Sequence, residues 1–163
     1  MAGIYLREAL IENVGPISSL DVSLELDTAG NPKPVIFVGK NGTGKTIFLS
    51  YVLDALAELA KKTFRDVVEG QVVGHSPYLK VISGGNSRSL CGISLSMLQF
   101  SDSDSKFCYI EKVGTIDSND YTTKLRGRFE DVKTWAKEEP HTKQITGDES
   151  RIETSFKNIS HRF

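Results

Sequence analysis

The chain has 163 residues, of which 39% are hydrophobic and 25% are charged, and its formal net charge is -1. This composition is typical of a single soluble domain with a hydrophobic core. It provides no overall electrostatic attraction for DNA or RNA, contains no apolar run of membrane-spanning length, and starts without the pattern of a secretory signal. We therefore expect a cytoplasmic protein with no membrane partner.

Two strands are expected in the first thirty residues. Residues 4–14 are rich in apolar side chains and end at the turn signal Gly15-Pro16. Residues 20–26, LDVSLEL, alternate strictly between apolar and polar. This alternation predicts a strand with one face in water.

A third strand, a loop and a helix are expected next. The apolar run PVIFV at residues 34–38 follows several turn residues, which favours a short buried strand. It leads into GKNGTGKT at residues 39–46, which fits the phosphate-loop pattern G-x-x-x-x-G-K-[ST]. Beyond the loop, helical spacing predicts an apolar face made of Leu49, Val52, Leu53, Leu56, Leu59 and Ala60. The same spacing puts on the opposite face Ser50, Asp54, Glu58 and Lys61.

Each residue type in the loop meets a requirement of phosphate binding. Glycines let the backbone turn so that successive N–H groups point into one concavity. Lys45 supplies a charge for the β- and γ-phosphates, and the Thr46 hydroxyl is suited to ligate Mg²⁺. The N-terminus of the following helix would face the same phosphates. The expected contact residues are Gly39, Lys40, Asn41, Gly42, Thr43, Gly44, Lys45 and Thr46.

Three further strands are expected after the helix, over residues 78–83, 90–100 and 106–113. Their short polar connections predict an antiparallel meander. Two of these strands contain or adjoin the cysteines, Cys91 and Cys108, which have neither a C-x-x-C spacing nor a nearby histidine. We expect buried thiols rather than a metal site or a catalytic nucleophile.

From residue 121 onward the sequence is mixed in charge and has few large apolar residues. Helices are expected near residues 128–139 and 148–158. We therefore divide the chain into a nucleotide-binding lobe over residues 1–120 and a polar helical tail, or the start of an insertion, over residues 121–163.

The order of these segments resembles a known family. A strand ending IENVGPI, the strand LDVSLEL, the run PVIFVGKNGTGKT and a long helix are similar to the N-terminal lobe of ATP-binding-cassette (ABC) ATPases. The likeness is closest to the SMC and RecF-like branch and to related AAA-family ATPases of DNA repair and phage defence. Asn41 and Gly42 add to this resemblance, since the loop in this class commonly has the sequence G-x-N-G-x-G-K-[ST]. The resemblance covers about residues 3–115 and is specific over 35–60.

The resemblance implies an α/β fold, a P-loop NTPase lobe of the ABC/SMC type. A mixed sheet would surround the Walker A helix, with an antiparallel β meander beside it. ATP and Mg²⁺ would be the cofactors, with Asn13 to Gly15 near the base. Gln144 has the chain position of the glutamine that senses the γ-phosphate, although an exposed polar residue is the simpler interpretation of it.

The resemblance also implies partners. In the family, two lobes form one head, and two heads sandwich two nucleotides. A C-terminal ATPase lobe or a second head, in a dimer of heads, is therefore expected, and DNA or a nuclease partner is expected by analogy. The analogy does not separate repair from defence.

The sequence departs from the family in the parts needed for hydrolysis. The family carries a Walker B strand that ends in Asp-Glu, and no apolar run followed by Asp-Glu occurs here. The run FCYIE comes closest, but no Asp precedes Glu111. Residues 82–86, ISGGN, imitate the family's signature Leu-Ser-Gly-Gly-Gln, yet the residues that follow alternate as in a strand. We therefore interpret both as mimics and find no general base.

Three functions follow as hypotheses. The first is an ATP- and Mg²⁺-binding lobe that is incomplete for hydrolysis, because charge stabilisation and water activation are shared with a missing lobe. The second is a small phosphotransferase, which needs an arginine-rich lid, and Arg126 and Arg128 are the one close arginine pair. The third is a non-hydrolysing, nucleotide-dependent interaction module.

Overall fold

The computed structural model describes residues 3–64, 67–69, 76–78, 93–102, 105–114, 141–147 and 149–160. Its elements, in chain order, are β1 (Tyr5–Val14), β2 (Ile17–Ser23), α1 (Lys45–Thr63), β3 (Val67–Glu69), β4 (Ser76–Tyr78), β5 (Ser94–Ser101), β6 (Lys106–Val113), β7 (His141–Thr146) and α3 (Glu149–Ser160). Several expectations fall outside the described residues: the helix over 128–139, most of the strand over 78–83, the signature mimic at 82–86, Cys91, Arg126 and Arg128.

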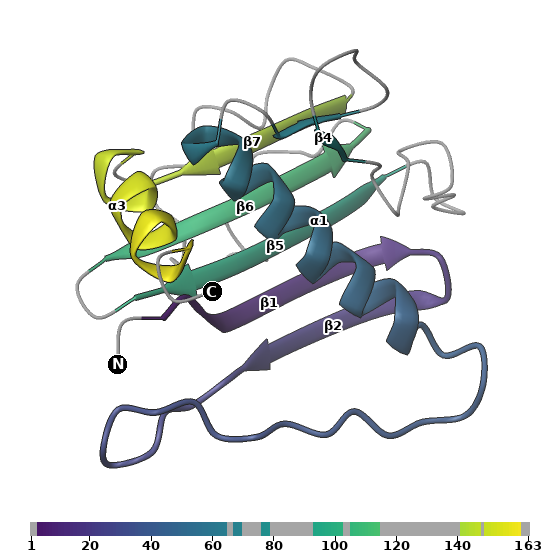
Figure 1. Ribbon diagram of the computed structural model, residues 1–163. Helices are drawn as coiled ribbons and strands as arrows, with labels where there is room; N and C mark the ends of the chain where they lie inside the picture. Colours follow the sequence, from purple (N-terminus) through teal and green to yellow (C-terminus); the bar gives the residue numbers. More distant parts are fainter. Residues whose placement is uncertain are drawn as a thin grey trace.

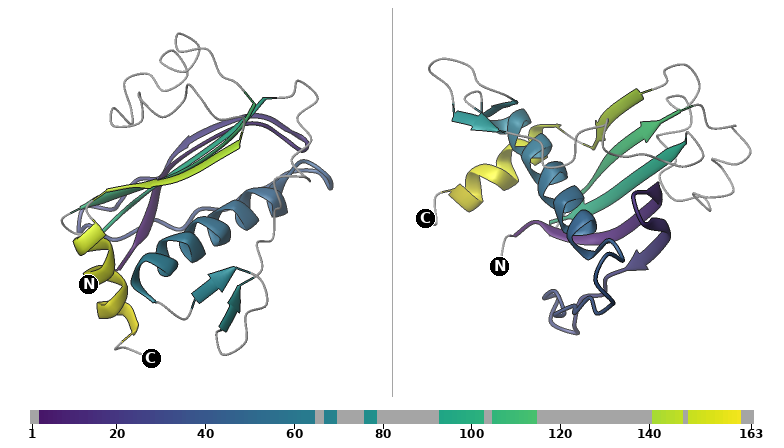
Figure 2. Two further views of the ribbon diagram at one scale, coloured as in Figure 1. Left: turned by 90° about the horizontal axis from the view of Figure 1, so that it is seen from above. Right: turned by 90° about the vertical axis from the view of Figure 1, so that its right-hand side faces the viewer.

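One antiparallel sheet forms the main layer, with the strand order β2-β1-β5-β6-β7 (Figure 1). β1 and β2 are joined by the tight turn at Gly15-Pro16, in which Val14 pairs with Ile17. Figure 2 shows that α1 and α3 cover the same face of this sheet. β3 and β4 form a separate parallel pair. No helix in the described ranges is long and apolar enough to cross a membrane.

The core lies between the helices and the sheet. Every second residue of a strand points to the same face, so each central strand contributes its alternate apolar residues to this layer. The buried apolar residues include Ala9, Ile11, Phe48, Tyr51, Ala55, Leu59, Leu98, Phe100, Phe107, Tyr109 and Ile152. α1 therefore rests on β1, β5 and β6, and its first turn projects over the β1–β2 side of the sheet (Figure 1).

The strands expected at residues 4–14 and 106–113 are confirmed by β1 and β6. The strand expected at 90–100 is confirmed over its second half by β5, and β5 and β6 form the antiparallel hairpin of the expected meander. The strand expected at 20–26 forms in part as β2. It begins three residues earlier, because Ile17 pairs with Val14 across the turn, and it ends at Ser23, so residues 24–26 lie outside it.

The expected packing face of α1 is wrong in part. Leu49 and Leu53 are 54% and 59% exposed, whereas Ser50 and Asp54 are buried. The helix is rotated because the aromatic rings of Phe48 and Tyr51 fill the space above the sheet, where they are 3% and 2% exposed. Burying aromatic side chains removes more apolar area from water than burying leucines does, so a second apolar stripe of the helix stays outside.

The strand expected at residues 34–38 does not form as a buried strand. The segment is not part of any sheet, and Ile36 and Val38 are 84% and 90% exposed. The physical reason is that a strand needs neighbours at its edges, and none of the described strands pairs with it. The described sheet is wholly antiparallel, so the mixed sheet around α1 stays a prediction.

The C-terminal region contains more structure than the expected polar tail. The helix expected over 148–158 is confirmed by α3. β7, however, was not expected, and it extends the main sheet by pairing with β6. Ile152 of α3 is fully buried and belongs to the same core as α1. Residues 141–147 and 149–160 are therefore part of the folded lobe.

A pair of isoleucine substitutions tests this packing. Ile152→Ala should lower the free energy of unfolding by about 2–5 kcal/mol, because it leaves a cavity in the core. Ile36→Ala, the same substitution at an exposed site, should change it by less than about 0.5 kcal/mol. Urea unfolding followed by circular dichroism measures both. Similar losses for the two variants would contradict the placement of α3.

Candidate functional site

The loop over residues 39–46 packs against the turn between β1 and β2. Gly44, the residue before α1, has a φ of +95° and lies against Ile17. A Cβ placed on Gly44 would be 2.4 Å from the Ile17 Cγ1 atom. No other residue type fits this contact or this left-handed backbone without strain. The close approach fixes where α1 begins relative to the sheet.

The start of α1 presents unpaired backbone donors. The first bond within the helix runs from the Phe48 N–H to the Gly44 carbonyl at 2.9 Å, so the preceding N–H groups lack helical partners. Gly44 provides no side-chain cap, and the first turn contains no acidic residue. The positive end of the helix dipole is therefore not neutralised by the helix itself.

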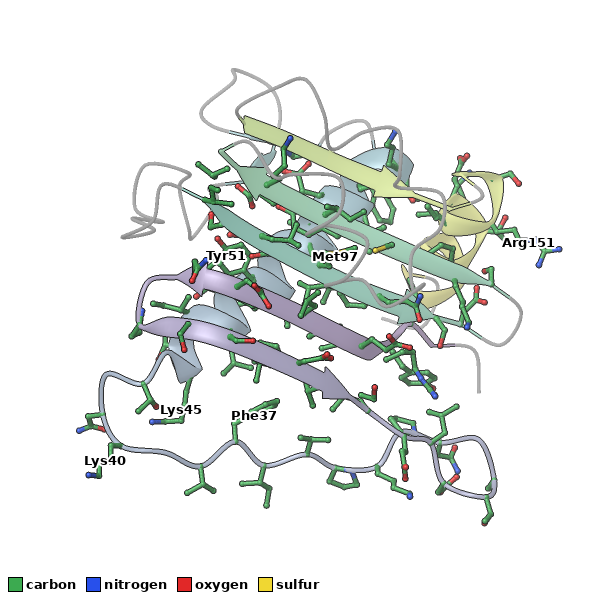
Figure 3. All side chains as sticks on the ribbon, turned by 180° about the vertical axis from the view of Figure 1, so that it is seen from behind. Phe37, Lys40, Lys45, Tyr51, Met97 and Arg151 are labelled. Atoms are coloured by element: carbon green, nitrogen blue, oxygen red, sulfur yellow. The ribbon has the colours of Figure 1, made fainter. Side chains whose placement is uncertain are left out.

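Lys45 is held over the loop by the loop's own backbone. Its Nζ atom donates to the carbonyl oxygens of Gly39 at 2.7 Å and Lys40 at 2.8 Å. Figure 3 shows Lys40 and Lys45 near each other at the beginning of α1. An ammonium group has three N–H donors, and the described residues supply acceptors for two of them. The third donor is therefore available to a ligand oxygen.

The remaining loop residues form a tight turn. The Thr43 hydroxyl donates to the Lys40 carbonyl at 2.9 Å, and the Thr43 N–H approaches the same oxygen at 3.4 Å. Gly42 has a φ of +83° with open space around its Cα. A Cβ on Gly39 would lie 2.9 Å from the Thr43 hydroxyl. Gly42 and Gly44 thus have backbone conformations that favour glycine, and the phosphate contacts expected of the turn stay a prediction.

Two hollows lie beside the loop. One, of about 370 Å³, is lined by Pro16, Asn41, Gly42, Gly44, Lys45, Thr46 and Ile47. The other, of about 240 Å³, lies between the loop and the start of β2, with Phe37, Val38 and Phe48 in its wall. The first hollow combines glycine backbone, the helix start, the Lys45 side chain and the exposed Thr46, so its donors fit a polyphosphate.

The structure brings the turn before β2 to this site but does not bring Gln144 there. Asn13 has a φ of +54° and adjoins the turn whose Pro16 lines both hollows. Gln144 lies on β7, at the opposite edge of the sheet from β2, and pairs with Ile110. A role for Gln144 at the phosphates therefore has no geometric support within the described lobe.

Glu111 lies in the core and not at the loop. It is 4% exposed, and its Oε2 atom accepts a hydrogen bond from the Tyr109 hydroxyl at 2.8 Å. Tyr51 of α1 is close enough that the Glu111 charge contributes to raising the Tyr51 pKa. Glu111 is absent from the lining of both hollows beside the loop, and its interpretation as a mimic of the general base stays a prediction.

Metal binding and thiol chemistry have little support outside the loop. Among the described residues, no group of three or more His, Cys, Asp or Glu could hold a metal ion. The Mg²⁺ expected at the Thr46 hydroxyl stays a prediction. Cys108 is buried, as expected, and burial raises the pKa of its thiol well above the usual range.

Pro16 and Ile17 were not predicted as site residues. They shape the site through the Gly44 contact and the walls of the hollows. The sequence signal for them was the turn Gly15-Pro16 followed by an apolar residue, but nothing local shows that this turn meets a loop more than twenty residues later.

Comparisons with protein-family models, with curated proteins and with solved structures find no match to this chain. The function must therefore be argued from the site itself.

Two glycine substitutions test the contact between Gly44 and Ile17. Gly44→Ala should lower the free energy of unfolding by more than the roughly 1–2 kcal/mol that a left-handed backbone costs an alanine, because its Cβ also collides with Ile17. Gly42→Ala has a similar φ but open surroundings, so it should lose only the conformational part. Equal losses in urea unfolding would contradict the contact.

The pH dependence of stability tests the buried tyrosine on α1. Burial, with the Glu111 charge as the next cause, raises the pKa of Tyr51 from 10.0 to about 12. The folded state therefore holds this proton more tightly than the unfolded chain, and its stabilising effect is complete below pH 10 and lost as the pH rises toward 12. Tyr51→Phe should make the unfolding free energy fall less steeply between these pH values. An unchanged slope would contradict the assignment.

Proposed function

We propose that this protein binds ATP and Mg²⁺ through residues 39–46 and acts as the nucleotide-binding lobe of an SMC/RecF-like ATPase. The observation that carries the proposal is the position of Lys45. Its ammonium group is fixed by two loop carbonyls at the beginning of α1, with one donor left for a ligand. A polyphosphate is the ligand whose charge and size match this combination.

The residues of the loop have separate tasks in this proposal. The backbone N–H groups at the start of α1 bind phosphate oxygens without moving, because Gly44 is fixed against Ile17. Lys45 neutralises negative charge on the β- and γ-phosphates. Thr46 would hold the metal through its hydroxyl, and Mg²⁺ would supply positive charge beside the phosphates.

Hydrolysis by the isolated chain is not part of the proposal. No acidic residue lines the hollow at the loop, and Glu111 is buried away from it. Activation of the attacking water therefore has to come from outside the described lobe. By analogy with the family, a C-terminal ATPase lobe or a second head would supply it, and DNA or a nuclease would be the further partner.

A nucleotide-dependent interaction module without hydrolysis is the second candidate. The exposed apolar residues beside the loop favour it, because apolar groups gathered on a surface commonly mark a protein contact. The two candidates differ in whether a partner lobe restores turnover. Both require the same phosphate site.

Calorimetric titration with ATP and Mg²⁺ tests the site. Lys45→Ala should weaken binding by about tenfold or more, because hydrogen bonds to charged groups contribute roughly 1.5–3 kcal/mol. Lys33→Ala is the matched control, since it removes the same charge from an exposed lysine that lines neither hollow, and we expect it to bind nearly as well as the intact chain. ATP turnover by all three proteins should stay at background. Equal loss in both variants would contradict a specific role for Lys45.

A further inference from the structure

Asn41 and Gly42 form an Asn-Gly pair in the middle of the loop, and both residues are exposed. A backbone bond runs from the Thr43 N–H to the Lys40 carbonyl, so these two residues are the central pair of a β-turn. Gly42 has a φ of +83°, as the third residue of a type II turn requires. The peptide group between Asn41 and Gly42 is therefore the part of the turn that the turn bond leaves free.

No hydrogen bond in the described part of the chain holds this peptide group or the side chain beside it. Neither the Gly42 N–H nor the Asn41 side-chain amide has a partner there, although Thr43 and Lys45 are both bonded within the same loop. A Cβ placed on Gly42 would meet nothing within 4 Å. The Gly42 nitrogen can therefore approach the Asn41 side-chain carbonyl carbon through open space and without losing a hydrogen bond.

That approach is the first step of asparagine deamidation. The Gly42 nitrogen gives up its proton and forms a bond to the Asn41 side-chain carbon, and the side-chain nitrogen leaves with that proton as ammonia. The product is a cyclic imide. Water then adds to one of the two imide carbonyls and breaks its bond to the Gly42 nitrogen, which leaves an aspartate or an isoaspartate at position 41. The reaction consumes water, releases ammonia and requires no oxidant or reductant.

Positive charge near the pair favours this reaction. Lys40 and Lys45 lie near each other at the beginning of α1 (Figure 3), and residues 28–53 contain no acidic side chain. The attacking nitrogen and the carbonyl oxygen both gain negative charge during the attack, and positive groups held nearby stabilise such charge. The start of α1 adds the positive end of its dipole.

Two other asparagines serve for comparison, because they lack these features. Asn31 precedes Pro32, and a proline nitrogen has no proton to lose. Asn13 precedes Val14, which lies in β1 and is 1% exposed, and a β-branched side chain crowds the backbone next to it. The attack available at Asn41 is therefore absent at Asn31 and hindered at Asn13.

We propose that Asn41 is a site of spontaneous deamidation, and that the carboxylate formed there weakens phosphate binding. The modification requires no nucleotide, whereas its effect rests on the proposed function. The new carboxylate would be the one acidic group within residues 28–53, in the wall of the hollow of about 370 Å³ that Lys45 also lines. It repels phosphate oxygens and competes with them for the Lys45 ammonium group. An isoaspartate also lengthens the main chain of the turn.

Peptide mapping tests the modification. The intact chain is kept at mildly alkaline pH without nucleotide, and cleavage after glutamate then releases residues 26–58, which contain both Asn31 and Asn41. Fragment ions in mass spectrometry locate the converted residue. We expect conversion at Asn41 to be about tenfold or more faster than at Asn13, because glycine has no Cβ to hinder the attack. No conversion is expected at Asn31.

Matched glycine variants identify the attacking nitrogen. Gly42→Ala should slow conversion at Asn41 by about tenfold, because its Cβ lies beside the attacking atom. Gly30→Ala is the control, since Gly30 has a similar φ of +81° and equally open surroundings, and it should leave the rate unchanged. Circular dichroism checks that both variants are folded. Equal rates in the two variants, or equal rates at Asn41 and Asn13, would overturn the modification site.

Calorimetric titration with ATP and Mg²⁺ measures the effect on binding. Asn41→Asp should weaken binding by about tenfold or more, because the added charge repels the phosphates, and fully converted chain should lose at least as much. Thr28→Asp adds the same charge at another exposed position and should bind as the intact chain does. Unchanged binding by the converted chain would overturn the effect. Conversion at Asn41 in a chain that never binds ATP would reject the proposed function and keep the modification site.

Discussion

The contact between Gly44 and Ile17 is the constraint on which the site depends. It joins the start of α1 to the turn between β1 and β2, with no room for a Cβ between them. Because α1 also packs Phe48, Tyr51 and Ala55 onto the sheet, the helix is fixed at its start and along its length. The loop before it is therefore held in shape by the core, and the unpaired N–H groups of the first turn stay aimed at one place.

The same arrangement leaves apolar side chains exposed on segment 34–38 and on the outer side of α1. α1 has an apolar face on the sheet and a second apolar stripe in water, and residues 34–38 extend beside it without strand partners. Exposed apolar surface of this kind commonly marks a site of contact with another molecule. Residues 34–38 lead directly into Gly39 and Lys40, whose carbonyl oxygens hold Lys45.

Local pattern predicted most of the single elements, and long-range packing decided the rest. Apolar pattern and turn residues were enough for β1 and β6, and for the presence of β2 although not for its bounds. Helix signals were enough for α3. The rotation of α1 was missed because it depends on which side chains the sheet can accommodate. β7 was missed because its sequence, HTKQIT, has one large apolar residue, and its strand form follows from pairing with β6.

The turn over residues 39–46 could be predicted from its glycine spacing, and its phosphate contacts stay a prediction. The contact between Gly44 and Ile17 could not be predicted, since it joins distant segments. The direct measurement is the amide NMR spectrum of the isotope-labelled chain during titration with inorganic triphosphate and Mg²⁺. We predict that the largest shifts fall on Gly42, Gly44, Lys45 and Thr46, at the start of α1. No saturable shift at these amides, or larger shifts on the far edge at β7, would contradict a preformed phosphate site.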